Sequence, residues 1–201
     1  VSQTERDSLL YTSGENLFIA GNYDRAVETL NSYVTEFPQG IFLVNARYYL
    51  AESLRKKGDD AGALKQYRFI IDQPNNQFTE ESLVAASAIL LDQEEYEEAF
   101  GLFRRLETAA TNSDNKIIAL QGELRSAYEM SDADNVIAAT DKIEQAINVP
   151  EELIRQAVFM RAKAYYSMGN LDMALFDFRR NDREVVSDEG AESKFRVAEI
   201  L

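Results

Sequence analysis

The sequence of 201 residues repeats a short pattern, and the period of this repeat constrains the fold more than any other feature. The stretches IAGNYDRAVETL (19–30) and SMGNLDMALFDF (167–178) both read Gly-Asn-large-Asp-x-Ala. The last residue of this pattern recurs in register, at steps of 37, 36, 37 and 38 residues, at Ala26, Ala63, Ala99, Val136 and Ala174. Such a period predicts an array of similar units that bury their apolar faces against one another.

Two further columns of residues keep this register. Twelve positions before the repeated alanine stand mostly small residues, at Gly14, Ala51, Ser87, Leu124, Ala162 and, one step further on, Ala198. Four positions after it stand mostly bulky residues, at Leu30, Tyr67, Phe103, Thr140 and Phe178. Two helices can cross at about 8 Å only where the side chains at the crossing are small. The columns therefore predict closely packed helix pairs, with the fourth unit departing from the pattern at Leu124, Val136 and Thr140.

Glycines, prolines and capping residues predict where the helices end. The prolines at 38, 74 and 150 fall between units, where a missing N–H group costs little. Left-handed helix ends are expected at Gly21, Gly58 and Gly169, and N-caps of the following helices at Asn22, Asp59, Asp132 and Asn170. In the second repeat this pattern predicts helices over 45–57 and 61–72, and no strand periodicity competes with it. Each unit is expected to be a helical hairpin.

These residues and their spacing resemble the tetratricopeptide repeat, which has a small residue in its first helix, a Gly-Asn/Asp-Tyr turn, an alanine in its second helix and a closing proline. The resemblance covers the whole chain. It implies an all-α fold, a right-handed superhelical solenoid of antiparallel helix pairs that forms a single domain over 1–201. The expected repeats are 7–43, 44–79, 80–116, 117–154 and 155–190, followed by half a repeat at 191–201.

The stretch 37–72 resembles more specifically the repeats of bacterial cell-envelope proteins related to outer-membrane assembly lipoproteins and the cell-division coordinator family. This resemblance implies a periplasmic or outer-membrane-associated protein rather than a cytoplasmic one. The sequence carries no targeting segment, so the expected localisation rests on the resemblance alone.

The final residues, AESKFRVAEIL (191–201), align without gaps on VNARYYLAESL (44–54). They are expected to form a first helix that lacks its second helix, with Phe195, Val197, Ile200 and Leu201 uncovered. We therefore expect the chain to be a fragment of a longer protein with at least one more repeat. The uncovered helix is expected to favour self-association.

Composition argues against several classes of function. The chain has 35 Asp and Glu against 21 Lys and Arg, and its net charge of -14 disfavours nucleic acids and anionic membrane surfaces as partners. Its apolar runs are too short for membrane insertion. The absence of Cys and His removes disulfides, thiolate chemistry and most metal sites.

Three charged stretches could carry chemistry, and each has a plainer interpretation. SDADNV (131–136) resembles the start of a calcium loop, but Ile137 and Ile143 stand where that loop needs Gly and Glu, so a helix start is expected. DQEEYEEA (92–99) is interpreted as a solvated helix start rather than as acid/base carboxylates. LRKKGD (54–59) places cations at a helix C-terminus. We expect no enzymatic activity, catalytic residue, cofactor or metal within this chain.

The family resemblance also implies where a partner binds, on a concave wall formed mainly by first helices. Wall positions lie four residues apart, at Tyr11 and Glu15, Tyr48 and Glu52, Val84 and Ala88, Gln121 and Arg125, Phe159 and Lys163, and Phe195 and Glu199. The partner-binding residues are expected to be Tyr11, Glu15, Tyr48, Glu52, Arg55, Gln121, Arg125, Phe159, Lys163 and Tyr166. Members that clamp a chaperone's C-terminal carboxylates carry Lys and Asn where this chain has Tyr48 and Glu52, which disfavours that role. Alternatively, the rings of Tyr11, Tyr48 and Phe159 only pack between neighbouring helices.

Two classes of function stay open at this point. The favoured one is a scaffold that binds a peptide or protein segment of unidentified sequence in its groove. The alternative is a substrate-presenting arm of a larger enzyme or glycan-handling protein whose catalytic part lies outside these residues. A lipoprotein signal upstream would favour the first class, and a catalytic domain downstream would favour the second.

Overall fold

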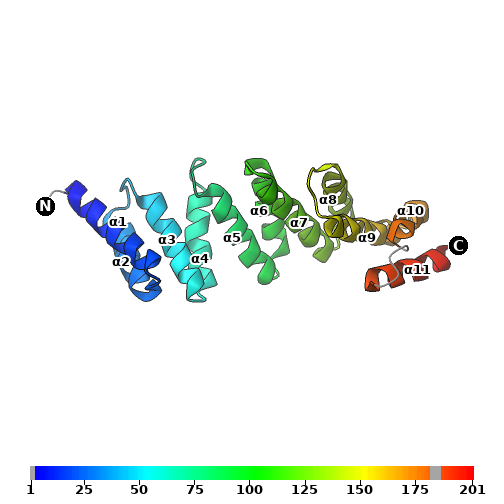
Figure 1. Cartoon of the computed structure of the whole chain (residues 1–201), viewed down its shortest axis with the longest axis horizontal. Coiled ribbons are helices and arrows are strands. Elements are labelled where there is room, and N and C mark those ends of the chain that lie inside the picture. Colours follow the sequence, from blue (N-terminus) through cyan, green and yellow to red (C-terminus); the bar gives the residue numbers. More distant parts are fainter. Residues whose placement is uncertain (1–2, 182–186) are drawn as a thin grey trace. The chain divides into compact units, whose positions relative to one another are not determined.

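The computed structural model describes residues 3–181 and 187–201, and this part of the chain forms eleven α-helices and no strand (Figure 1). The helices are α1 (Gln3–Ile19), α2 (Tyr23–Glu36), α3 (Leu43–Lys56), α4 (Asp60–Ile71), α5 (Thr79–Asp92), α6 (Tyr96–Ala109), α7 (Ser113–Glu129), α8 (Ala133–Gln145), α9 (Glu151–Ser167), α10 (Leu171–Asn181) and α11 (Asp188–Ile200). The predicted all-α class is confirmed, and the helices expected over 45–57 and 61–72 are α3 and α4. Residues 182–186 of the expected fifth repeat lie outside the described part.

The helices form two compact units, residues 1–89 and 90–201, and the boundary falls inside α5. In the first unit α1 packs on α2, α2 on α3, and α3 on α4. In the second unit each helix from α6 to α11 packs on the next one in sequence. Packing between consecutive antiparallel helices is typical of the stacked hairpins of a helical solenoid.

Two first helices begin earlier than the expected repeat boundaries at 117 and 155. α7 begins at Ser113, because the Asn112 side chain caps it by accepting a hydrogen bond of 2.8 Å from the backbone N–H of Asn115. α9 begins at Glu151, directly after Pro150. Both helices have 17 residues, against 14 in α3, so the first helices of these two repeats are longer than that of the second repeat.

The turns inside the first, second and fifth hairpins have the predicted left-handed glycine. Gly21, Gly58 and Gly169 have φ angles of 73°, 79° and 76°, in the left-handed region. The next residue caps the second helix in each predicted case, with side-chain oxygens of Asn22, Asp59, Asp132 and Asn170 accepting the backbone N–H three residues later. The third and fourth repeats place Glu94 (φ 63°) and Ser131 (φ 56°) in the same region, which the sequence does not signal.

The repeated small residues lie in the core. Complete burial is found at Ala26, Ala51, Ala63, Ala99, Ala162 and Ala174. The bulky residues of the second column, Leu30, Tyr67, Phe103 and Phe178, are buried as well. Ala198 differs because it is exposed, since no helix of the described residues follows α11 to cover it. The columns therefore mark the helix crossings, as predicted.

The fourth repeat replaces the missing small and apolar residues by other means. Its close helix approach occurs at Gly122 on α7, where a Cβ atom would overlap the ring of Phe103 on α6. Leu124, at the position of the small residue, is buried in the core. The buried Thr140 hydroxyl lies 2.9 Å from the carbonyl oxygen of Val136 and 3.1 Å from that of Ala157, so its polar group is satisfied between α8 and α9.

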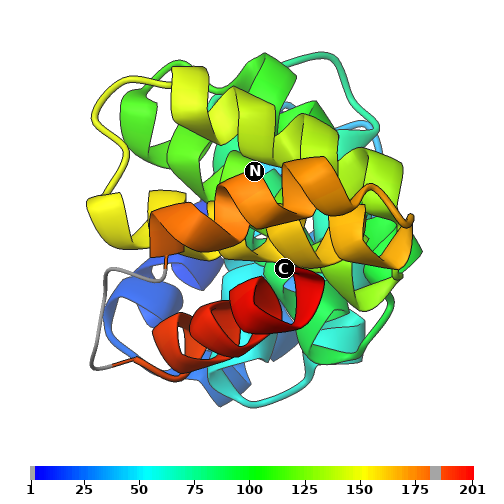
Figure 2. The ribbon, with the colours of Figure 1, turned by 90° about the vertical axis from the view of Figure 1, so that its right-hand side faces the viewer.

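The C-terminal helix α11 forms as predicted, with Ser187 as its N-cap. It lies beside α10 and also contacts α9; Figure 2 shows α10 in orange and α11 in red. Val197 and Ile200 pack against the cluster around Phe178, whereas Phe195 is 62% exposed. The apolar residues expected to be uncovered are therefore divided between a packed side and an exposed side of the helix.

Candidate partner-binding surfaces

The first helices of successive hairpins contact one another, α1 with α3, α7 with α9, and α9 with α11. The second helices of successive hairpins, such as α6 and α8, make no comparable contact among the described residues. We call the side of each unit on which first helices contact one another its first-helix face. All ten predicted partner-binding residues lie on α1, α3, α7 and α9.

In the first unit, Tyr11 is a core residue rather than an exposed one. Its side chain is 6% exposed, and its ring stacks on Phe42 with centroids 4.5 Å apart. Its hydroxyl donates a hydrogen bond of 2.7 Å to the half-buried Glu15 carboxylate, one turn further along α1. Burial and this bond raise the pKa of Tyr11. Packing, the alternative considered for this ring, describes its placement.

Tyr48, Glu52 and Arg55 come together on α3. The half-buried Tyr48 ring stacks on Phe78 with centroids 4.2 Å apart, and burial together with nearby carboxylates raises its pKa to about 12. The Glu52 carboxylate accepts the hydroxyl of Tyr67 and lies 3.4 Å from the Arg55 guanidinium. Glu52 is thus a partly screened carboxylate that already has a cation.

Tyr49 is a surface residue that the sequence reasoning missed. Its ring lies 5.2 Å from Phe18 and 6.5 Å from Tyr11, measured between centroids, so it bridges α3 and α1. Burial is the main cause that raises the pKa of Tyr49. The negative charge of Glu15 and hydrogen bonding with that carboxylate raise it further. The Tyr-Tyr pair at 48–49 was the available signal, but the sequence alone does not tell which ring faces the preceding repeat.

In the second unit, Gln121 and Arg125 are exposed on α7, whereas Phe159 on α9 is only 7% exposed. The Phe159 ring meets Phe178 edge-on at 6.2 Å, so it too belongs to the core. Packing between helices describes Phe159 as it describes Tyr11. The exposed residues Gln121 and Arg125 stay candidates for direct contact with a partner.

Lys163 lies at a shallow groove near the turn end of α7, α8 and α9. Its ammonium is 5.4 Å from the Phe159 ring centroid and 5.6 Å from that of Tyr128, and 3.7 Å from a Glu192 oxygen. A hydrogen bond with Tyr128 is the main cause that raises the pKa of Lys163. The groove has a volume of about 360 Å³ and is lined by Tyr128, Glu129, Ser131, Ala133, Val136, Lys163, Ala164 and Ser167.

Tyr166 connects α9 with α11. Its hydroxyl donates a 3.1 Å hydrogen bond to Glu199, and the Arg196 guanidinium lies 4.9 Å from its ring centroid. Tyr128 stands four positions after the small-residue column, as Arg55 and Tyr166 do, so the register could have identified it. The contact of Arg196 could not be found in this way, because it depends on how α11 packs.

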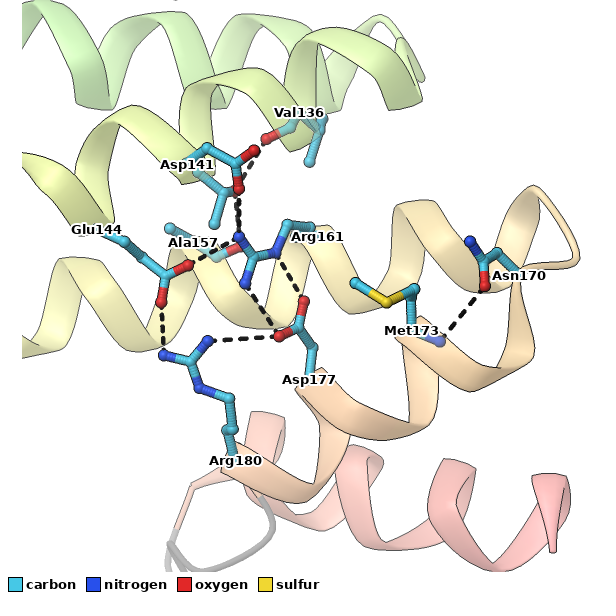
Figure 3. A network of polar contacts seen from close by, with 10 residues as sticks. Val136, Asp141, Glu144, Ala157, Arg161, Asn170, Met173, Asp177 and Arg180 are labelled. Carbon is cyan, nitrogen blue, oxygen red and sulfur yellow. Dashed lines mark hydrogen bonds and ion pairs between the residues drawn. The ribbon is translucent and has the colours of Figure 1, made fainter.

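The densest charged network lies in the interior of the second unit (Figure 3). The buried Arg161 on α9 binds Asp177 on α10 and also Asp141 and Glu144 on α8, and Arg180 binds Glu144. These contacts hold three helices together. They present no open carboxylate pair of the kind that acid/base catalysis requires.

The stretches examined for chemistry have structural roles. Asp132 of the SDADNV stretch caps α8, and the DQEEYEEA stretch spans the end of α5 and the start of α6. Within 3–181 and 187–201, no group of His, Cys, Asp or Glu side chains is arranged to hold a metal ion. Over the same ranges no helix combines the length and apolar character needed to cross a bilayer.

Residues 8–40 match the tetratricopeptide repeat family. The chain has the tetratricopeptide-repeat fold. A tetratricopeptide repeat protein from Parabacteroides merdae ATCC 43184 superposes with a TM-score of 0.61 at 16% identity, over 99% of this chain and 73% of that one. Nearly identical TPR-like repeats assigned to a kinesin light chain of Podosopora anserina give a TM-score of 0.52 at 13% identity, over 100% and 97% of the two chains.

At these identities the solved structures establish the fold alone. No curated protein sequence matches the chain. Tetratricopeptide-repeat proteins are generally non-catalytic scaffolds that bind protein partners. The fold therefore suggests a protein-binding scaffold.

Proposed function

We propose that this chain is a scaffold that holds a segment of a partner protein against its first-helix faces. The observation that supports this is the same on both units: half-buried or exposed charges stand beside fixed aromatic rings where first helices meet. In the first unit these are Glu15 and Tyr49, and in the second they are Lys163 and Tyr128. Rings held by packing lose little entropy on binding, and adjacent charges select the partner.

The first-helix face of the second unit offers the more open part of this surface. Gln121 and Arg125 are exposed on α7, and Lys163 borders the groove of about 360 Å³. A groove of this size accommodates one or two side chains of a bound segment. A partner that docks here is expected to place acidic or hydrogen-bonding side chains near Arg125 and Lys163.

The envelope localisation belongs to the same proposal, and its support is the resemblance of residues 37–72 to repeats of bacterial envelope proteins. Fractionation of the source cells tests it. Recovery of the protein with the periplasm or outer membrane agrees with the proposal, and recovery with the cytosol contradicts it. The alternative of a substrate-presenting arm uses the same faces and differs only in what is attached to the chain.

Affinity capture with the full-length protein tests the scaffold proposal. Lys163→Ala and Arg125→Ala should each reduce the recovered partner, because they remove charge from the first-helix face without opening the core. Lys65→Ala is the matched control, since Lys65 is an exposed cation on the second helix α4. A partner that is recovered equally well with all three variants, and equally with Glu52→Ala, would place binding elsewhere.

A further inference from the structure

The repeat register places opposite charges beside the rings of the two units. The position directly after the small-residue column is Glu15, Glu52 and Ala88 in the first unit, and Arg125, Lys163 and Glu199 in the second. In the second unit Lys163 supplies a cation to two rings, at 5.4 and 5.6 Å from their centroids. At the equivalent site of the first unit the chain provides a carboxylate instead of a cation.

Glu15 differs from Glu52, the carboxylate at the same repeat position on α3. Glu52 has the Arg55 guanidinium at 3.4 Å, whereas no Lys or Arg nitrogen of the described residues lies within 4.0 Å of Glu15. Glu15 accepts the hydroxyl of Tyr11 at 2.7 Å, and Tyr49 is near enough for the charge of this carboxylate to raise its pKa. The neutral Tyr11 donor fixes the orientation of the carboxylate, but it leaves the negative charge uncompensated.

Two aromatic rings that contact each other, Phe18 on α1 and Tyr49 on α3, belong to the surroundings of this carboxylate. Phe18 stands three residues after Glu15 on α1, and its ring centroid lies 5.2 Å from that of Tyr49 on α3, with the ring planes at 47°. Glu15, Phe18 and Tyr49 are all half-buried, so each keeps part of its surface open to solvent. A cation next to such a carboxylate also gains from the faces of the rings.

We propose that Glu15, Phe18 and Tyr49 form the seat of a lysine or arginine side chain from the partner segment. The ammonium or guanidinium pairs with the Glu15 carboxylate, and its apolar stem lies over Phe18 and Tyr49. A metal ion is a poorer occupant, because one carboxylate and two phenols provide too few oxygen ligands for Ca²⁺ or Mg²⁺. This inference rests on the proposed scaffold function and adds the chemistry of the partner at one site.

Selection of short random peptides against the whole chain tests the seat, followed by measurement of the affinity of the selected peptides. Peptides that bind the first unit should carry Lys or Arg, and Glu15→Gln should weaken them by about tenfold. The amide oxygen of Gln still accepts the Tyr11 hydroxyl, so the variant is expected to fold. Glu28→Gln, an exposed glutamate on α2, is the matched control and should leave the affinity unchanged. Phe18→Leu should also weaken the basic peptides.

Different outcomes separate this inference from the scaffold proposal. If selected peptides lose affinity with Lys163→Ala but carry no excess of basic residues and ignore Glu15→Gln, the seat is overturned and the scaffold function stands. If peptides are selected but neither variant affects them, or if no peptide is selected, both ideas are contradicted. If Glu15→Gln alters only the oligomeric state, the occupant is a second copy of the chain, and the inference of a partner cation is wrong.

Discussion

The guanidinium of Arg161 on α9 donates to both oxygens of the Asp177 carboxylate on α10, with Nε to Oδ2 at 2.7 Å and Nη2 to Oδ1 at 3.0 Å (Figure 3). Asp177 has no exposed surface, and the exposed fraction of Arg161 is 7%. The pair lies where the two helices of the fifth repeat meet, and Arg161 extends the contact to Glu144 on α8 at 2.7 Å. A charged pair thus lies at the centre of an otherwise apolar stack of helices.

Arg161→Leu should destabilise the protein by about 3–5 kcal/mol, because the buried Asp177 loses its main partner. Arg180→Leu is the control, since Arg180 is half-exposed and approaches Asp177 only to 3.5 Å; it should cost less than about 1 kcal/mol. Urea unfolding of both variants measures the difference. Equal losses for the two arginines would show that burial of the bidentate pair is not what stabilises this repeat.

Two helical glycines give a matched test of close packing in the second unit. At Gly122 a Cβ atom would overlap ring carbons of Phe103, so Gly122→Ala should cost about 1–3 kcal/mol. At Gly101 on α6 nothing lies within 4 Å of such an atom, and Gly101→Ala should stabilise the helix by up to about 1 kcal/mol. Thermal unfolding should therefore move in opposite directions. Adding Phe103→Leu to Gly122→Ala should recover part of the loss if the ring is the cause.

The features that the sequence predicted correctly depend on local chemistry. A glycine such as Gly58 and a cap such as Asp59 favour the turn from a first helix into a second, and a small residue such as Ala51 favours the close crossing of two helices. These residues return in most repeats, so the register makes them visible. The third and fourth turns have Glu94 and Ser131 in the left-handed conformation, and neither residue type indicates this conformation in the sequence.

The surface residues were harder to predict because exposure depends on the neighbouring repeat. Tyr11 and Phe159 occupy the predicted wall positions, yet Phe42 and Phe178 cover their rings. Tyr49 was missed because its surroundings come from α1 and not from its own helix. Arg161 was missed because its partners lie 16 to 20 residues away in sequence. Which side of a helix meets which neighbour is set by packing, not by the period of one helix.

Stability should fall in alkaline solution, because five tyrosines of the first unit have raised pKa values, with burial as the main cause: Tyr11, Tyr33, Tyr48, Tyr49 and Tyr67. The unfolded chain releases these protons near pH 10, whereas the folded chain keeps them, so the free energy of unfolding decreases as the pH rises above about 10. For Tyr48, whose pKa is about 12 in the folded chain, this loss of stability continues up to about pH 12. Tyr48→Phe should reduce this alkaline loss by about 1 kcal/mol after solvent screening. An alkaline loss of the same size in the variant would contradict the assignment.

Lys142 on α8 holds two carboxylates, with its ammonium 2.6 Å from Glu107 on α6 and 2.9 Å from Glu123 on α7. Burial raises the pKa of Glu123, whose side chain is 3% exposed and whose Oε1 has no hydrogen-bond partner. Burial also acts to raise the pKa of Glu107, but hydrogen bonds with Lys142 and Glu123 outweigh it and lower the value. The Lys142 ammonium therefore compensates the negative charge that these two carboxylates bring together.

Lys142→Met should lower stability by about 2 kcal/mol at neutral pH, and the loss should shrink toward about pH 4. Without the cation, the folded chain binds the Glu123 proton more tightly than the unfolded chain, so stability decreases as the pH rises through the interval between the two pKa values. Urea unfolding of the wild type and the variant across this range measures the effect. The double variant Lys142→Met with Glu123→Leu should lose most of the pH dependence, because the buried carboxylate is gone. A deficit of constant size at every pH would mean that Lys142 contributes packing of its stem and not charge compensation.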